Sequence, residues 1–194
     1  NNASSNTMQG IFFNSDSHYN NISHNLCGWN GDHGISISAS DYNRFWSNNI
    51  SHNDHGSALG TYADYNTVWL NTFYANSNGG GGYGIRVPPS GLTPGSNNLI
   101  YWNNVLFNDR AAEDHGVNNQ WNKPYGFGCG NYWSDYGGVD SFSGPLQNIA
   151  GPDGFGDTAY PIQPYSAQDN YPWMQRITKA MPVENSDTGE LFFD

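Results

Sequence analysis

The chain has 194 residues and a formal net charge of −11, from 17 acidic and 6 basic residues. Because the basic residues are scattered, no basic stripe exists that could follow a phosphate backbone, which argues against nucleic acids and anionic membranes as partners. Charged residues make up only 12% of the sequence, so its polarity comes mainly from Asn, Ser, Gly and Tyr, which favour turns over helices. Aromatic residues make up 15%, which indicates an ordered chain with an aromatic core or stacking surfaces.

The two cysteines, Cys27 and Cys129, form neither a metal-binding pair nor a disulfide framework, and we expect no disulfide between them. The sequence has no run of 18 apolar residues and no signal segment at its start. We therefore expect a soluble, secreted protein with residues missing before Asn1.

An internal repeat of 23 residues organises the first half of the chain. It starts with Tyr-Asn, and Asn97-Asn98 takes the same place after a longer interval. Each copy opens an Asn-x-apolar-x-x-Asn-x-apolar-x-x-Asn pattern, which fits neither the helical period nor a long strand and predicts short strands separated by bends. The Tyr-Asn copies are Tyr19-Asn20, Tyr42-Asn43 and Tyr65-Asn66.

A Gly-led apolar alternation at residues 10–13, 34–37, 56–59 and 84–87 adds a third short strand to each repeat. Stacked repeats of this kind predict an all-β fold, a right-handed single-stranded parallel β-helix whose rungs cover residues 1–122. Apolar positions would stack inside, and Asn side chains would form hydrogen-bonded columns at the corners, where Asn tolerates left-handed backbone. The stretch from Pro88 to Gly95 predicts a loop that leaves one corner.

After Asn108 the repeat decays into an aromatic-rich, irregular segment, which predicts a C-terminal cap over residues 123–183, because a solenoid must cover its last rung. Residues 184–194 form an acidic and apolar tail, either a linking strand or a disordered end.

Nearly the whole chain resembles the NosD-like family of parallel β-helix repeat proteins, the rungs generically and two C-terminal blocks more specifically. The two blocks are Asn119 to Tyr136, which contains Gly130-Asn131-Tyr132-Trp133-Ser134-Asp135-Tyr136, and Asp153 to Trp173. The resemblance implies a β-helix superfamily with sugar-binding modules and polysaccharide-degrading enzymes, found in the periplasm and on archaeal surfaces. It does not choose between these functions, because fold does not fix function.

The family usually carries a short acidic loop here, which the resemblance matches to Asp140, Asp153 and Asp157, with an insertion from Ser141 to Pro152. Alternating acids with glycines between them can wrap one calcium ion, so these three residues are a candidate calcium site. The alternative is that they simply make tight turns.

His33 and His55 occupy equal places in successive rungs, within Asp-His-Gly triplets, so their imidazoles could converge. Imidazole suits copper, and the family resemblance implies copper as a candidate ligand. The alternative, which we favour, is a corner motif with solvent-facing histidines.

Two columns of aromatic residues are candidates for carbohydrate binding, because stacked rings one rung apart can form a platform for sugar rings. They can equally cover and stabilise the side of the solenoid. The columns are Tyr19, Tyr42 and Tyr65, and Trp46, Trp69 and Trp102.

The leading hypothesis is a non-catalytic extracellular, cell-surface or periplasmic protein for structural assembly, adhesion or carbohydrate contact. Its partners would be a glycan or further copies stacked end to end, with no membrane insertion. One alternative is a polysaccharide lyase or glycoside hydrolase, for which Asp41 and Asp64 in adjacent rungs are the candidate carboxylates. A second alternative is a periplasmic copper-binding accessory protein. Calcium is the only cofactor expected.

Overall fold

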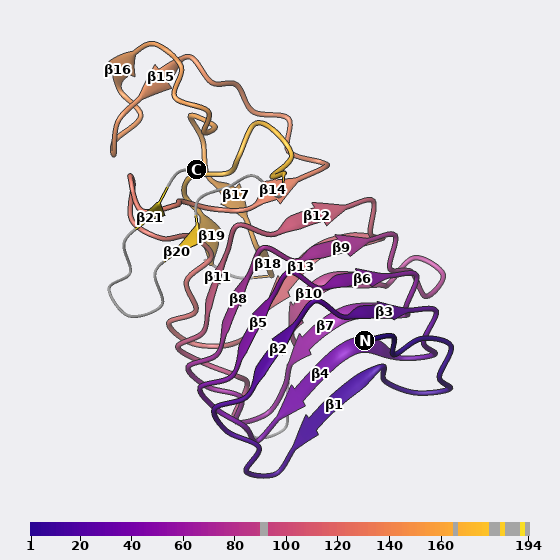
Figure 1. Ribbon diagram of the computed structural model, residues 1–194. Coiled ribbons are helices and arrows are strands. Elements are labelled where there is room, and N and C mark those ends of the chain that lie inside the picture. Colours follow the sequence, from indigo (N-terminus) through magenta and orange to yellow (C-terminus); the bar gives the residue numbers. More distant parts are fainter. Residues whose placement is uncertain (90–92, 165–166, 179–182, 185–190, 193–194) are drawn as a thin grey trace.

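The structure is a computed structural model that describes residues 1–89, 93–164, 167–178, 183–184 and 191–192. The described residues form strands, turns and bends but no helix. Among them there is accordingly no helix that is long and apolar enough to cross a membrane. As predicted, parallel strands stack into a solenoid of about five turns. Figure 1 shows the rungs stacked along one axis, with the C-terminal segment at one end.

Each rung contributes one strand to each of three parallel sheets. Sheet 1 has the longest strands, in the order β1 (Ile11–Asn14), β4 (His33–Ser38), β7 (His55–Leu59), β10 (Tyr83–Val87), β13 (Arg110–Asp114) and β18 (Gln163–Pro164). Sheet 2 consists of β2 (Asn21–Ser23), β5 (Arg44–Trp46), β8 (Thr67–Trp69) and β11 (Leu99–Tyr101). Sheet 3 consists of β3 (Leu26–Gly28), β6 (Asn49–Ser51), β9 (Thr72–Tyr74), β12 (Asn104–Leu106) and β14 (Tyr132–Trp133).

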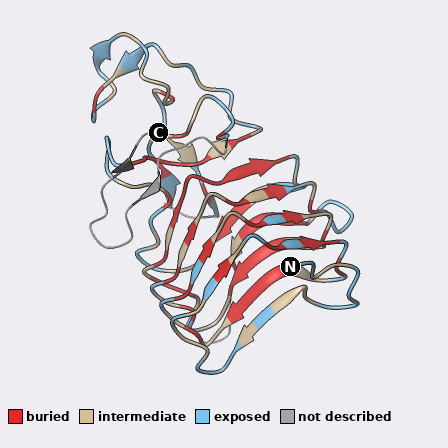
Figure 2. Cartoon of the chain, viewed as in Figure 1, coloured by how far each residue is buried: buried red, intermediate tan, exposed pale blue. Residues whose placement is uncertain are grey.

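The core is a set of apolar columns that run through the rungs, as the repeat predicted. Because parallel pairing keeps every copy of the repeat in register, equal positions lie about 4.8 Å apart and pack on one another. In sheet 2 the inner column is Ile22, Phe45, Val68 and Ile100. Figure 2 shows buried residues along the strands of the solenoid and many exposed residues in the C-terminal segment.

Buried asparagines form hydrogen-bonded ladders at the corners. In the middle ladder, the backbone N–H and the Nδ2 of Asn48 both donate to Oδ1 of Asn71, at 3.0 and 2.9 Å. Nδ2 of Asn71 also donates to the carbonyl of Phe45, so each amide satisfies backbone groups that the bend leaves without strand partners. The middle ladder runs through Asn25, Asn48, Asn71, Asn103 and Asn131.

The left-handed residue at each corner is the one before the asparagine, and not the asparagine itself as the sequence suggested. Tyr42, Ser47 and His52 have φ values of 57°, 53° and 57°. Left-handed backbone costs about 1–2 kcal/mol for such residues, and the buried ladder bonds that follow offset this cost.

The C-terminal segment first adds strands to the solenoid and then covers its last rung. β14 extends sheet 3 and β18 pairs with β13 in sheet 1, so residues beyond 122 still add to the stack. The buried Trp133 ring stacks on Tyr160 at 4.3 Å and helps cover the last rung. Three antiparallel pairs complete the segment: β15 (Phe142–Ser143) with β16 (Ile149–Ala150), β17 (Tyr160–Pro161) with β19 (Gln168–Asp169), and β20 (Val183–Glu184) with β21 (Leu191–Phe192).

Cys27 and Cys129 are buried and free, as expected. The predicted loop from Pro88 to Gly95 connects β10 to β11, and its residues 90–92 lie outside the described residues. Most of the predicted tail also lies outside them.

Candidate functional site

The outer face of sheet 1 carries two columns of side chains from successive rungs. The second position of β1 shows which face is outward, since Phe12 is 51% exposed while Ile11 and Phe13 pack against the core. One column consists of His33, His55, Tyr83 and Arg110. The other consists of Phe12, Ser36, Ala58, Arg86 and Glu113.

His33 and His55 lie together, as their equal places in the repeat predicted, with ring centroids 5.0 Å apart. Nδ1 of His33 lies 2.6 Å from Oδ1 of Asp32, and Nε2 of His33 is buried without a hydrogen-bond partner among the described residues. Nδ1 of His55 accepts the backbone N–H of Tyr83 at 3.1 Å. Nε2 of His55 lies 3.2 Å from Nη1 of Arg86.

Both imidazoles are neutral at neutral pH. Burial, the Arg86 guanidinium and His33 together lower the pKa of His55 to about 4, with burial as the largest cause. Burial also lowers the pKa of His33, although the neighbouring Asp32 carboxylate acts in the opposite direction. Sheet 1 therefore presents uncharged ring nitrogens beside a permanent positive charge.

Arg86 links the two columns. Its Nε and Nη2 donate to Oε2 of Glu113 at 3.1 and 3.0 Å, and Oε1 of Glu113 lies 3.0 Å from Nε2 of His115. The side chains of Arg86 and Glu113 are 20% and 11% exposed, so the ion pair is largely shielded from water. The repeat pattern did not single out this pair, although the alternation in residues 84–87 places Arg86 opposite its apolar neighbours.

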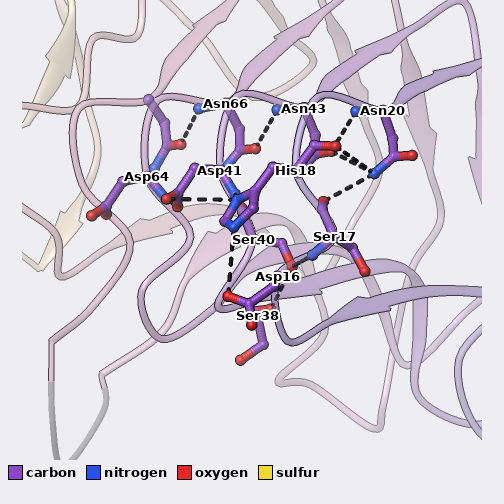
Figure 3. Close-up of polar contacts among 11 residues, drawn as sticks. Asp16, Ser17, His18, Asn20, Ser38, Ser40, Asp41, Asn43, Asp64 and Asn66 are labelled. Atoms are coloured by element: carbon purple, nitrogen blue, oxygen red, sulfur yellow. Dashed lines mark hydrogen bonds and ion pairs between the residues drawn. The ribbon is translucent and has the colours of Figure 1, made fainter.

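Asp41 and Asp64 are the candidate carboxylates of the enzyme hypothesis. Both accept hydrogen bonds from backbone N–H groups at a corner of the solenoid (Figure 3). Oδ1 of Asp41 accepts the backbone N–H of Asp64 at 2.9 Å, and Oδ1 of Asp64 accepts that of Ser96 at 2.7 Å. In the rung before, Nδ1 of His18 accepts the N–H of Asp41 at 2.8 Å. The column is therefore another ladder that satisfies backbone groups.

Tyr19, Tyr42 and Tyr65 form an exposed stack, with 5.1 Å between successive ring centroids and interplanar angles of 5° and 6°. Because the rings stack on one another, the faces of the middle ring are covered and mainly ring edges and hydroxyl groups meet the solvent. A sugar ring packs on an aromatic face, so this stack offers few free faces to a glycan.

Trp46 and Trp69 also stack, with centroids 5.1 Å apart, but the placement of Trp102 in their column is wrong. The register pairs Trp69 with Tyr101, and Trp102 is only 2% exposed. Trp102 is the left-handed residue before the ladder asparagine, with φ of 56°, so its side chain leaves the strand in another direction. Lys123 lies over the Tyr101 ring, 4.4 Å from its centroid, where the tryptophan column ends.

The three acids proposed for calcium accept hydrogen bonds from backbone N–H groups of their own loop. Asp140 accepts the backbone N–H groups of Asp153 and Gly154 at 3.0 and 2.8 Å, and Asp157 accepts that of Ser141 at 3.0 Å. No group of three or more His, Cys, Asp or Glu residues in the described part of the chain is arranged to hold a metal ion. Calcium at this loop stays a prediction.

This arrangement of three parallel sheets, Asn ladders and stacked rungs defines the class of protein, a parallel β-helix. Residues 1–81, of the 194 in the chain, match the model of the NosD family, described as periplasmic copper-binding protein. The chain is thus a NosD-like parallel β-helix, and the matched residues lie in the rungs and not in the two C-terminal blocks. Neither the curated proteins nor the solved structures gave a match.

The pair His33 and His55 does not fit a copper ion that both rings would bind. Metal-binding nitrogens need free lone pairs, but Nδ1 of His55 accepts a backbone N–H and its Nε2 faces the Arg86 cation. Only Nε2 of His33 is left, and one nitrogen does not make a site. The geometry therefore gives no support to copper at these two residues.

Proposed function

We propose that this chain is a non-catalytic β-helix protein that works outside the cytoplasm and contacts a glycan along the outer face of sheet 1. The observation that carries the proposal is the pair of side-chain columns on that face. A polymer lying along the solenoid axis would meet equivalent positions every rung, about 4.8 Å apart. The periplasmic description of the matching family supports the location.

The face offers both kinds of group that carbohydrate recognition uses. Phe12 is 51% exposed, and its neighbour in the column is the small Ser36, which covers little of the ring on that side. Three rungs further along the column, a distance of about 14 Å, Arg86 supplies guanidinium hydrogen-bond donors. Pockets for sugars combine apolar or aromatic surface with a few placed polar groups in this way.

The roles of the acids support a binding protein over a hydrolase. A retaining or inverting glycosidase needs two carboxyl groups that flank the scissile bond. Asp41 and Asp64 instead accept backbone N–H groups within the corner, and Glu113 is paired with Arg86. These bonds occupy the carboxylates in structural contacts.

A glycan array probed with the purified chain tests the proposal, with two variants to locate the surface. Phe12→Ala removes the open ring on sheet 1, and Tyr19→Ala removes an exposed ring of the tyrosine stack. We expect the wild type and Tyr19→Ala to bind the same glycans and Phe12→Ala to lose them. Loss in Tyr19→Ala alone would assign binding to the tyrosine stack, and an array with no bound glycan would contradict the proposal. In that last case, end-to-end assembly, visible by electron microscopy, becomes the leading function.

A further inference from the structure

Hydrogen-bond donors converge on one point of the outer face of sheet 1. Since Nδ1 of His55 accepts the backbone N–H of Tyr83, the proton of the neutral ring sits on Nε2. That Nε2–H faces Nη1 of Arg86 at 3.2 Å and Nδ2 of Asn78 at 3.5 Å. All three nitrogen atoms carry hydrogens, so donors face donors here, and among the described residues no oxygen atom accepts the Nε2–H of His55.

An acceptor oxygen placed among these groups would satisfy them together. A cation is disfavoured there because the guanidinium carries a permanent positive charge. A planar carboxylate fits best, since guanidinium groups recognise carboxylates with paired charge-assisted hydrogen bonds. Asn78 is exposed, so the cluster is open to solvent from its side.

We propose that His55, Arg86 and Asn78 bind the carboxylate of an acidic sugar, such as a uronic acid unit, within the glycan on sheet 1. This inference rests on the proposed glycan-binding function and names the class of its ligand. It also accounts for the poor fit of copper, because the same arginine that repels a metal ion attracts a carboxylate.

Glu113 is the internal competitor of the ligand. Its Oε2 accepts two hydrogen bonds from Arg86, at 3.1 and 3.0 Å, through Nε and Nη2, while Nη1 is directed to His55. Glu113 therefore holds the guanidinium in place and lowers the local positive charge. Replacing its carboxylate with a neutral amide would leave more of the Arg86 charge to the ligand.

Calorimetric titration with oligogalacturonate tests the inference, with its methyl-esterified form as the uncharged comparison ligand. Arg86→Gln removes the charged donor and Asn78→Asp places a carboxylate at the site, and we expect each to weaken binding about tenfold or more. We expect Glu113→Gln to strengthen binding. Arg44→Gln, at an exposed arginine on β5 of sheet 2, changes the net charge equally and should leave binding unchanged.

The fold of each variant is checked by thermal unfolding. If Arg86→Gln does not fold, Arg86→Gln combined with Glu113→Gln removes the ion pair without leaving a buried charge, and Asn78→Asp changes only an exposed residue.

Equal binding of acid and ester, or equal effects of Arg86→Gln and Arg44→Gln, would overturn the inference. Such a result with glycans still bound on the array would leave the proposed function standing. Glucuronate, inorganic sulfate and Cu²⁺ are titrated in parallel. Binding of sulfate without glucuronate would show a site for small anions only, and binding of Cu²⁺ lost in His55→Gln would show a metal site, so either result would also overturn the inference.

Discussion

Asp169 occupies the place that the next asparagine of the middle ladder would take above Asn131. Its Oδ2 accepts the backbone N–H of Asn131 at 2.7 Å, as Oδ1 of Asn131 accepts that of Asn103 at 3.0 Å. An asparagine accepts from one rung and donates to the next, whereas an ionised carboxylate only accepts. Asp169 also accepts the Nε1–H of Trp133 and the N–H of Tyr171, at 2.9 and 3.1 Å. It thus ends the ladder and ties it to the cap.

This position makes stability depend on pH near neutrality. Burial raises the pKa of Asp169 from 3.8 to about 7, although its hydrogen bonds act against the rise. The folded state then binds a proton more tightly than the unfolded chain, so the stabilisation is present at low pH and is lost as the pH rises through about 7. From about pH 6.5 to about pH 8 we expect the free energy of unfolding to fall by about 1 kcal/mol.

Urea unfolding at several pH values measures this change, with Asp169→Asn as the control that lacks the titrating group. The lowered pKa of His55, about 4, affects stability at pH values below about 6.5, outside this window. An unchanged slope in Asp169→Asn would show that other groups cause the pH dependence.

Gly130 is required where the ladder meets the cap. A Cβ atom at this position would overlap the carboxylate of Asp169, which is fully buried and cannot move aside. Gly130→Ala should therefore lower the free energy of unfolding by about 1–3 kcal/mol or more. Gly137→Ala is the matched control, because a Cβ there meets no atom within 4 Å, and it should change stability by less than about 0.5 kcal/mol. Equal thermal shifts in the two variants would contradict the role of Asp169 as a fixed terminator.

Each buried ladder asparagine satisfies several backbone groups at once. Asn71 is fully buried, accepts the N–H of Asn48 and donates to the carbonyl of Phe45. Asn71→Ala would leave both groups without these partners in the interior, at a cost of about 1–3 kcal/mol for each. Chemical unfolding should show this loss, whereas Asn49→Ala, at an exposed residue of β6, should cost little. A small effect of Asn71→Ala would mean that water replaces the side chain.

The fold could be predicted because the same pattern of apolar and Asn positions occurs in several successive rungs. Each rung pairs with a copy of itself, so one apolar position and one Asn position, such as Ile50 and Asn53, determine strand, corner and register together. The repeat did not predict the left-handed residue before each asparagine, because its residue type differs from one corner of the rung to the next. At three successive corners it is Tyr42, Ser47 and His52.

The site was harder to predict because it depends on which residues face each other across rungs of unequal length. Arg86 and Glu113 lie 27 residues apart, since the loop after β10 breaks the 23-residue spacing. Trp102 does not belong to the tryptophan column, because Tyr101 holds that register. Trp69 and Tyr101 each lie three residues after the first ladder asparagine of their rung, whereas Trp102 lies four residues after it.

Ser57 is a polar residue in an apolar column of sheet 1, between Ile35 and Ile85. Its hydroxyl group is buried without a hydrogen-bond partner among the described residues, beside a cavity of about 10 Å³ lined by side chains such as Phe73. Ser57→Val removes the unsatisfied hydroxyl and fills the space, so we expect it to raise the free energy of unfolding by about 1–2 kcal/mol. Ser57→Ala removes the hydroxyl without filling the cavity and should stabilise less, which separates the two effects in thermal unfolding. Loss of stability in both variants would show that the hydroxyl has a partner, such as a trapped water, and that the column needs a polar group at this rung.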